Sequence, residues 1–328
     1  MSIALLAAAA VIIICVLINR ISNKIGVPVL IAFIGLGMLF GSDGILKIPF
    51  ENYDFAEQIC TIALIFIMFY GGFGTRWSEA KPVAAKSIVM STVGVAATAG
   101  LTGLFCHFIL KFPLWESMLT GSVISSTDAA SVFSILRSKK LGLKENTASL
   151  LEMESGSNDP CSYMLTAIIL SIMGGKISGG AIVYLIFAQF AYGLILGFVI
   201  AIGAKLVLQH FKFSTEGFDA AFVLAVAVLA YALPSAIGGN GYLSTYIVGI
   251  ILGNSDIKNK KSMVHFFDGL TGLMQMLIFF LLGLLSFPSA LPKVFPTALA
   301  ISLFLMLIAR PIVTFGILTP MKLSLIHI

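Results

Sequence analysis

Apolar segments about as long as a bilayer is thick recur along the whole chain, and they restrict its fold more than any other feature. A helix that crosses the hydrocarbon core needs about 20 mostly apolar residues. Hydropathy and length indicate about eleven such segments. Their ranges are 4–18, 27–40, 56–74, 84–110, 117–136, 148–173, 181–208, 217–235, 241–253, 266–287 and 294–318.

The composition agrees with this pattern. Of the 328 residues, 59% are hydrophobic and 11% are charged, whereas about 25% of the residues of a soluble protein are charged. The sequence therefore predicts an all-α polytopic membrane protein in contact with the lipid bilayer. Its net charge of +5 comes from basic residues in short separate loops, and such residues do not indicate a nucleic-acid partner.

The basic residues fall unevenly between the two sides of the membrane. Loops after odd-numbered segments hold fourteen Lys and Arg residues, and loops after even-numbered segments hold four. Because basic loops stay in the cytoplasm, we expect the loops around 137–144 and 258–261 to be cytoplasmic. The N-terminus is then outside, the C-terminus is cytoplasmic, and the location is the plasma membrane. The first segment lacks a basic n-region, which favours a retained helix.

Sequence patterns typical of enzymes are missing. The four cysteines, Cys15, Cys60, Cys106 and Cys161, are scattered and are interpreted as small apolar residues. The chain contains no zinc-protease helix motif, nucleotide-binding loop or nucleophile elbow. We therefore predict neither enzymatic activity nor a cofactor.

Acidic residues interrupt the apolar pattern most sharply in LLEMESGSNDPCSYML, residues 150–165. An ionised carboxylate at the bilayer centre costs at least a few kcal/mol. Ser155 and Asp159 are four residues apart and share a helix face. Pro160 has no N–H, so it frees a carbonyl one turn earlier and favours a kink. This turn offers a hydroxyl, the Asn158 amide and a carboxylate, which are hard oxygen ligands suited to an alkali cation.

The preceding segment carries SVISSTDAASVF, residues 122–133. Its hydroxyls compete with helical backbone hydrogen bonds, and irregular backbone in a membrane is tolerated only where protein covers it or a cavity adjoins it. We therefore expect a broken helix with Thr127 and Asp128 beside the helix of Asp159, as in transporter sites at the membrane midplane. Alternatively, such acids pair with basic residues and only hold helices together; for Glu154 both interpretations stay open.

A carboxylate at such a site can be neutralised by a proton or by a cation, but not by both. Exposure of the site to each side in turn then exchanges one for the other. Asp159 is the predicted binding carboxylate, and Asn158 orients it. Ser155 and Thr127 supply ligand oxygens, and Asp128 polarises or stabilises the broken helix. A cation channel or a non-exchanging uniporter could use the same acids, although a channel more naturally shows ring-forming pore motifs.

The motifs STDAASV and ESGSNDP together resemble the paired motif of NhaP-type monovalent cation/proton antiporters, which are relatives of the sodium/proton exchangers. VPVLIAFIGLGMLFG, GNGYLSTYIVGIILGN and LIARPIVTF agree in order and spacing, so the resemblance covers nearly the whole chain. It is closest to the bacterial potassium/proton branch. The resemblance implies exchange of K⁺ or Na⁺ for H⁺ by a homodimer, and electroneutral exchange because Asn158 precedes the carboxylate.

The resemblance also implies an inverted-repeat fold with broken helices. Residues 1–175 would form the first six-helix repeat with the ion-binding core helices, 176–212 the linker helix, and 213–328 an incomplete second repeat. About eleven of about thirteen expected spans are present, which indicates a C-terminally truncated chain without the second broken helix.

Two positions qualify the resemblance. Tyr70 stands in FYGGFG where many relatives carry an acid, so an outer coordinating acid is expected to be missing. The resemblance assigns Glu154 to core electrostatics with an arginine partner. Arg310 lies deep in a predicted segment and is assigned to the same role, whereas the family counterpart of the Glu154 partner is expected beyond Ile328.

Overall fold

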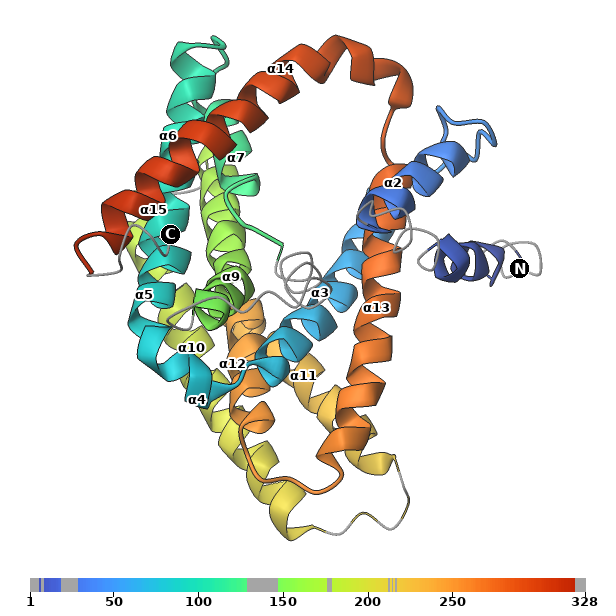
Figure 1. Cartoon of the computed structure of the whole chain (residues 1–328), viewed down its shortest axis with the longest axis vertical. Coiled ribbons are helices and arrows are strands. Elements are labelled where there is room, and N and C mark those ends of the chain that lie inside the picture. Colours follow the sequence, from blue (N-terminus) through green and yellow to red (C-terminus); the bar gives the residue numbers. More distant parts are fainter. Residues whose placement is uncertain are drawn as a thin grey trace. The chain divides into compact units, whose positions relative to one another are not determined.

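The computed structural model describes residues 6, 9–18, 29–128, 147–175, 179–211, 213, 215 and 217–321. Every regular element in these ranges is a helix (Figure 1), so the predicted fold class is confirmed. Six helices of the described chain are long and apolar enough to cross a membrane. They are Tyr53–Gly74, Trp77–Phe108, Gly179–His210, Phe218–Ala236, Lys260–Leu284 and Pro288–Leu318.

One compact unit contains residues 1–67 and 264–295. Its elements are the helix Ala9–Ile18, α2 (Val29–Phe40), the first part of α3 (Tyr53–Gly74), most of α13 (Lys260–Leu284), η4 (Pro288–Ala290) and the start of α14 (Leu291–Phe304). Helices α2 and α13 approach closely because a glycine lies at their contact. A Cβ atom on Gly37 would lie 2.1 Å from the carbonyl oxygen of Phe280.

The second compact unit contains residues 68–263 and 296–328, and it holds the predicted site. After the end of α3, a continuous span consists of α4 (Trp77–Ala80), η1 (Lys81–Val83), α5 (Ala84–Val89), the π-helical η2 (Met90–Gly94) and α6 (Val95–Phe108). The chain continues through α7 (Leu114–Val123), α9 (Thr147–Met173), α10 (Gly179–His210), α11 (Phe218–Ala236) and α12 (Gly241–Gly253). The end of α14, the π-helical η5 (Leu305–Ala309) and α15 (Arg310–Leu318) complete the unit.

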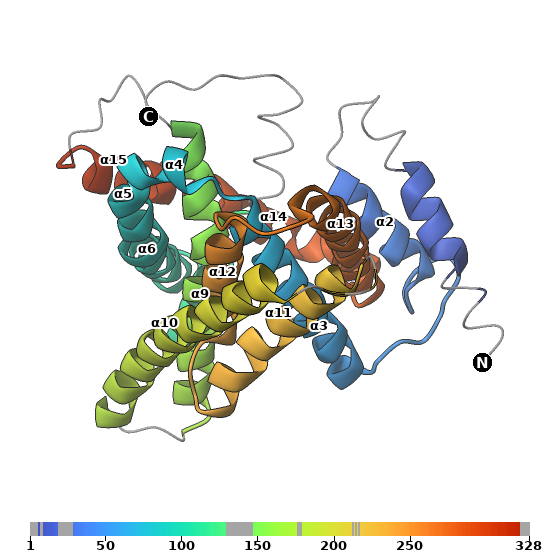
Figure 2. The same ribbon diagram turned by 90° about the horizontal axis from the view of Figure 1, so that it is seen from below.

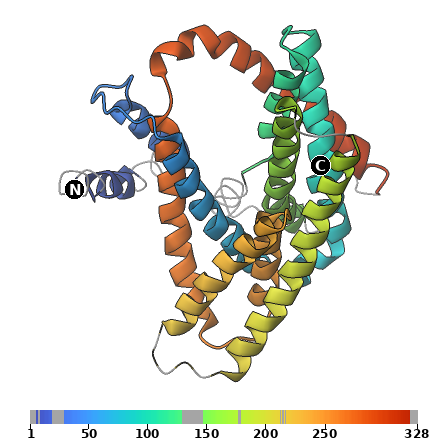
Figure 3. The same ribbon diagram turned by 180° about the vertical axis from the view of Figure 1, so that it is seen from behind.

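Helix α9 lies beside α6 and α7 (Figure 1 and Figure 3). Small residues let α6 and α7 come together, since a Cβ atom on Gly121 would lie 2.2 Å from the carbonyl oxygen of Ala99. The hydroxyl of Ser162 on α9 donates a hydrogen bond of 2.6 Å to the carbonyl of Ser122 near the end of α7. Small residues and hydroxyl bonds of this kind are typical of contacts between membrane helices. They fix the end of α7 against the middle of α9.

Helix α12 is enclosed by α9, α10 and α11 (Figure 2). Ten of its 13 residues are buried. At its N-terminus the Asn240 side chain accepts a hydrogen bond of 3.0 Å from the backbone N–H of Leu243, which satisfies one of the free donors of the first turn. Farther along, a Cβ atom on Gly249 would lie 2.2 Å from the carbonyl oxygen of Phe69 in α3. Helix α12 is therefore held tightly along its whole length.

The helix boundaries agree closely with the predicted segments. The segment 148–173 corresponds to α9, and 241–253 coincides with α12. The segment 117–136 is predicted to be a broken helix; α7 ends at Val123 and residues 124–128 are not helical. The break is therefore confirmed as far as Asp128, whereas 129–136 lie outside the described residues. Helix α9 remains helical through Pro160.

Candidate functional site

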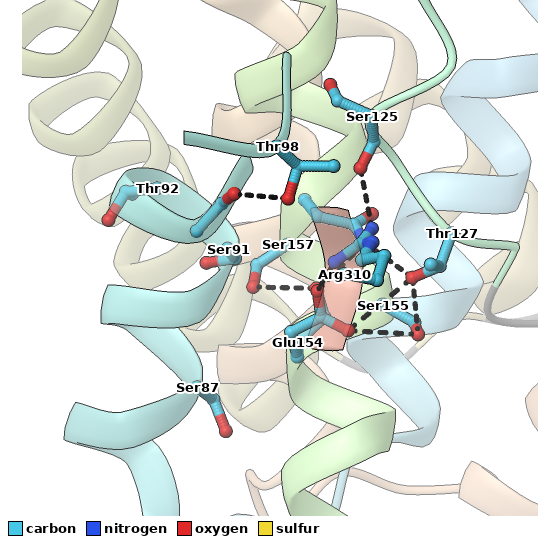
Figure 4. A network of polar contacts seen from close by, with 12 residues as sticks. Ser87, Ser91, Thr92, Thr98, Ser125, Thr127, Glu154, Ser155, Ser157 and Arg310 are labelled. Atoms are coloured by element: carbon cyan, nitrogen blue, oxygen red, sulfur yellow. Dashed lines mark hydrogen bonds and ion pairs between the residues drawn. The ribbon is translucent and has the colours of Figure 1, made fainter. Parts of the chain in front are cut away.

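The candidate site lies where the non-helical residues after α7 meet the middle of α9, inside the second unit (Figure 4). Thr127 supplies the central hydroxyl. Its Oγ1 atom lies 3.0 Å from Oγ of Ser155 and accepts a hydrogen bond of 2.6 Å from Nδ2 of Asn158. Two predicted ligand hydroxyls and the predicted neighbour of the carboxylate are thus brought together. Because residues 124–128 leave the helix, the Thr127 side chain reaches α9 instead of following the face of α7.

Asn158 is completely buried, and its amide orientation is fixed by its partners. Nδ2 donates to Thr127 and also, at 3.3 Å, to Oε1 of Glu154. Its carbonyl oxygen Oδ1 is buried and has no hydrogen-bond partner among the described residues. Unsatisfied buried acceptors are uncommon in native proteins and call for an explanation. A cation or a proton donor at this point would supply the missing partner.

Asp159 follows directly on α9 and is half-buried. The hydroxyl of Ser126 and the carboxylates of Asp128 and Glu154 lie close enough to Asp159 to act on its charge. Three acids, Asp128, Glu154 and Asp159, therefore lie close together where the irregular backbone meets α9. Such a concentration of negative charge in a low-dielectric region favours a bound cation.

Glu154 is paired with Arg310, the residue that the sequence analysis assigned with it to core electrostatics. Nη1 of Arg310 lies 3.3 Å from Oε1 of Glu154, and the Glu154 residue is only 5% exposed. Among the described residues, Arg310 is therefore the ionic partner of Glu154. The family counterpart expected beyond Ile328 stays a prediction.

The local structure before Arg310 explains how the side chain reaches the site. Arg310 begins α15 directly after the π-helical turn η5, and such a turn shifts the helix register by one residue. Its Nη2 atom also donates a hydrogen bond of 2.6 Å to the carbonyl oxygen of Ser125. A cation beside carbonyls at the end of a helix complements the negative end of the helix dipole. Arg310 thus holds α9 and the broken end of α7 together.

Three residues that contact the site were not singled out from the sequence. Ser126 lies close enough to Asp159 to act on its charge. Asn240 and Tyr246 of α12 contact the same stretch of α9. The serine could have been found from its place in the hydroxyl-rich motif, but no local pattern connects α12 with α9. Tyr70 is half-buried in α3, and its proposed replacement of an outer acid stays a prediction.

Comparison with known proteins gives a consistent result. A sequence model of the family described as "sodium/hydrogen exchanger, transmembrane" matches residues 9–328. The K⁺/H⁺ antiporter NhaP2 of Shewanella sp. (strain MR-4) is 33% identical over 312 residues, which are 94% of this chain and 54% of that protein. The K⁺/H⁺ antiporter NhaP of Alkalimonas amylolytica is 35% identical over 313 residues, again 94% of this chain and 54% of that protein.

The fold has a close counterpart among solved structures. The structure of the sodium proton antiporter MjNhaP1 from Methanocaldococcus jannaschii at pH 8 matches with a TM-score of 0.86 and 25% identity. The match covers 99% of this chain and 80% of that chain. The chain spans about half the length of the curated relatives it matches.

Proposed function

Because the chain belongs to the sodium/hydrogen exchanger family, we propose that it exchanges a monovalent cation, K⁺ or Na⁺, for protons at Asp159. The main support is the surroundings of this one carboxylate. The neutral hydroxyl of Ser126 lies close to it, while Glu154 is already compensated by Arg310. Asp159 is therefore the acid whose charge needs an exchangeable ion.

The oxygens around Asp159 supply a plausible ligand set for that ion. The carbonyl oxygen of Asn158, which has no hydrogen-bond partner among the described residues, is buried next to it. The hydroxyl of Thr127 accepts a hydrogen bond from Asn158 and lies 3.0 Å from the hydroxyl of Ser155. Oxygen atoms are the ligands that hard cations prefer. Asp128 adds negative charge to the same region. In this proposal Glu154 and Arg310 keep the scaffold neutral and do not bind the transported ion.

Competition for one carboxylate couples the two fluxes. A proton on Asp159 removes the charge that a cation needs, and a bound cation prevents protonation. Access from each side of the membrane in turn then gives obligatory exchange. Asn158 is neutral, so only one charge changes hands, and we propose electroneutral exchange. A channel or a uniporter with the same acids is the alternative, and it would show cation flux without coupled proton flux.

The remaining proposals concern the setting of the site. Apolar side chains such as Val183, Phe187 and Phe198 of α10 are more than half exposed, as expected for contact with lipid. We propose a multi-pass protein of the plasma membrane, with the N-terminus outside, the C-terminus in the cytoplasm, and a homodimeric state. The division into a first repeat (1–175), a linker helix (176–212) and a second repeat (213–328) is part of this proposal. The protein is proposed to be a transporter without enzymatic activity, as its named relatives are antiporters.

The test is transport by the purified protein in proteoliposomes that contain a pH-sensitive dye. A K⁺ or Na⁺ gradient should drive proton movement in the opposite direction, and Asp159→Asn should abolish it. The thermal midpoint of the protein in detergent, measured against cation concentration, reports binding separately because a ligand of the folded state stabilises it. Proton flux that persists in Asp159→Asn, or cation flux without protons in the wild type, would contradict the proposal.

A further inference from the structure

The turn of α9 that carries the candidate site is weak by itself. Pro160 has no N–H, so the carbonyl of Gly156 lacks its usual helical donor. Gly156 is also among the least favourable residues for a helix interior, costing about 1 kcal/mol relative to alanine. Asn158 and Asp159 lie between these two positions. Their placement to within a few tenths of an ångström therefore depends on contacts from neighbouring helices.

Helix α12 supplies such contacts at both ends of the weak turn. Nδ2 of Asn240 donates a buried hydrogen bond of 2.9 Å to the carbonyl oxygen of Pro160. Six residues later, the ring of Tyr246 covers Gly156, where an added Cβ atom would lie 2.9 Å from Cε2 of the ring. Both side chains are almost completely buried. The two contacts come from one helix and enclose the turn from 156 to 160.

The donor of Asn240 is held in a fixed direction. Its Oδ1 atom caps α12 by accepting from the N–H of Leu243, at 3.0 Å, and its own N–H donates to the carbonyl of Gln189 on α10, at 3.1 Å. The side chain cannot turn its amide over without losing both the cap and the bond to Pro160. One residue therefore performs two separate tasks, and the two tasks can be separated by substitution.

We propose that Asn240 is a positioning residue of the cation/proton site: through the Pro160 carbonyl it holds the turn of Asn158 and Asp159 in the geometry that binds the ion. It acts through the backbone next to Asp159 and does not touch the ion. The proposal rests on the proposed function only for the nature of the ligand. The mechanical part, the support of the turn by α12, stands on the hydrogen bonds alone.

Three variants separate the tasks. Asn240→Ser keeps an effective helix cap but is too short to reach Pro160, whereas Asn240→Ala loses the cap as well. The matched control is Asn254→Ser at the other end of α12. Asn254 also bridges two helices, since Nδ2 donates to the carbonyl of Thr75 at 2.8 Å and Oδ1 accepts from the N–H of Trp77 at 2.8 Å, but these bonds do not involve α9.

Two measurements on the purified full chain test the proposal. The first is amide hydrogen exchange of peptides that cover residues 156–164. Asn240→Ser should speed their exchange about five- to tenfold, as expected for the loss of one buried hydrogen bond, while Asn254→Ser should leave these peptides unchanged. The second is the K⁺ or Na⁺ concentration that gives half of the thermal stabilisation. It should rise about fivefold or more in Asn240→Ser and stay at the wild-type value in Asn254→Ser.

The outcomes are distinguishable. If Asn240→Ser matches the wild type in both measurements and only Asn240→Ala differs, Asn240 is a helix cap and the proposal is wrong. If Asn254→Ser changes exchange in 156–164 as much as Asn240→Ser does, the effect is general loosening and the proposal is also wrong. If the wild type shows no stabilisation by K⁺ or Na⁺ while the 156–164 peptides respond to Asn240→Ser alone, the proposed ligand is wrong and the positioning role stands.

Discussion

The pair of Glu154 and Arg310 gives the most quantitative test of this structure. Replacing Arg310 by methionine keeps most of the side-chain volume and removes the only ionic partner that the structure shows for Glu154, at 3.3 Å. The described hydrogen bonds that the Glu154 carboxylate would then keep are long, at 3.3 Å from Asn158, 3.4 Å from Thr127 and 3.5 Å from Ser155. These bonds are neutral, so they replace little of the lost interaction.

The expected cost follows from burial. Removing one partner of a buried ion pair costs about 3–5 kcal/mol, because the other charge stays buried without compensation. The side chain of Arg310 is 18% exposed, which places the expected loss for Arg310→Met near the lower end, about 3 kcal/mol. Glu154→Gln combined with Arg310→Met removes both charges. The double variant should recover about 2–3 kcal/mol of the sum of the single losses.

A double-mutant cycle measures this coupling directly. The assay is equilibrium unfolding in mixed micelles with SDS, followed by loss of helicity, for the wild type, both single variants and the double variant. An internal control is the exposed pair Arg76–Glu79, whose atoms lie even closer, at 3.0 Å. Arg76→Met should cost about 0.5 kcal/mol or less because water screens this pair. A coupling below about 0.5 kcal/mol between Glu154 and Arg310 would refute the assigned scaffold role.

Other predictions address the turn and the outer surface. Asp159→Asn should leave the thermal midpoint unchanged or raise it, since a costly buried acid is removed, while the response of that midpoint to K⁺ and Na⁺ disappears. In the wild type, the cation concentration for half-maximal exchange should rise by up to about tenfold per pH unit toward acid pH, because protons occupy the same carboxylate; a value independent of pH would place the site elsewhere. Gly156→Ala should lower the unfolding free energy by about 1–3 kcal/mol through the clash with the Tyr246 ring, and adding Tyr246→Leu should recover part of this loss. Hydrogen bonds from Ser289 lower the pKa of Asp43 below its usual 3.8. These hydrogen bonds should therefore be fully formed above pH 3.8 and be lost as the pH falls through the lowered pKa of Asp43. The chemical shift of the Ser289 backbone amide, followed by NMR over a pH series, measures this loss.

Much of the helical architecture can be predicted because lipid imposes it. The thickness of the bilayer sets the length of an apolar helix, and this is why the predicted segments 148–173 and 241–253 fall on α9 and α12. The break after α7 was also predictable from residues 122–128, since closely spaced hydroxyls weaken a helix. In both cases the physical cause lies within about twenty consecutive residues.

The contacts that build the site come from residues far apart in the chain, and no local pattern encodes them. Glu154 and Arg310 are separated by 156 positions, and Asn240 and Pro160 by 80. The orientation of Arg310 further depends on the π-helical turn η5, and helix periodicity applied to a regular α-helix would place this side chain one residue out of register. The sequence could therefore indicate which side chains are chemically unusual, but not which of them meet.

In the proposed function, the division of charge at the site lets one acid be exchangeable while its neighbour is not. Glu154 and Asp159 lie five residues apart on α9, and both carry carboxylates in a low-dielectric region. Arg310 pairs with Glu154 and also holds the end of α7 through the carbonyl of Ser125. In the described part of the chain Asp159 lies near the Ser126 hydroxyl and has no ion pair. A fixed cation beside Asp159 would compete with any transported ion, so under the proposed function the pairing of the arginine with Glu154 keeps Asp159 available to exchange a proton for a cation.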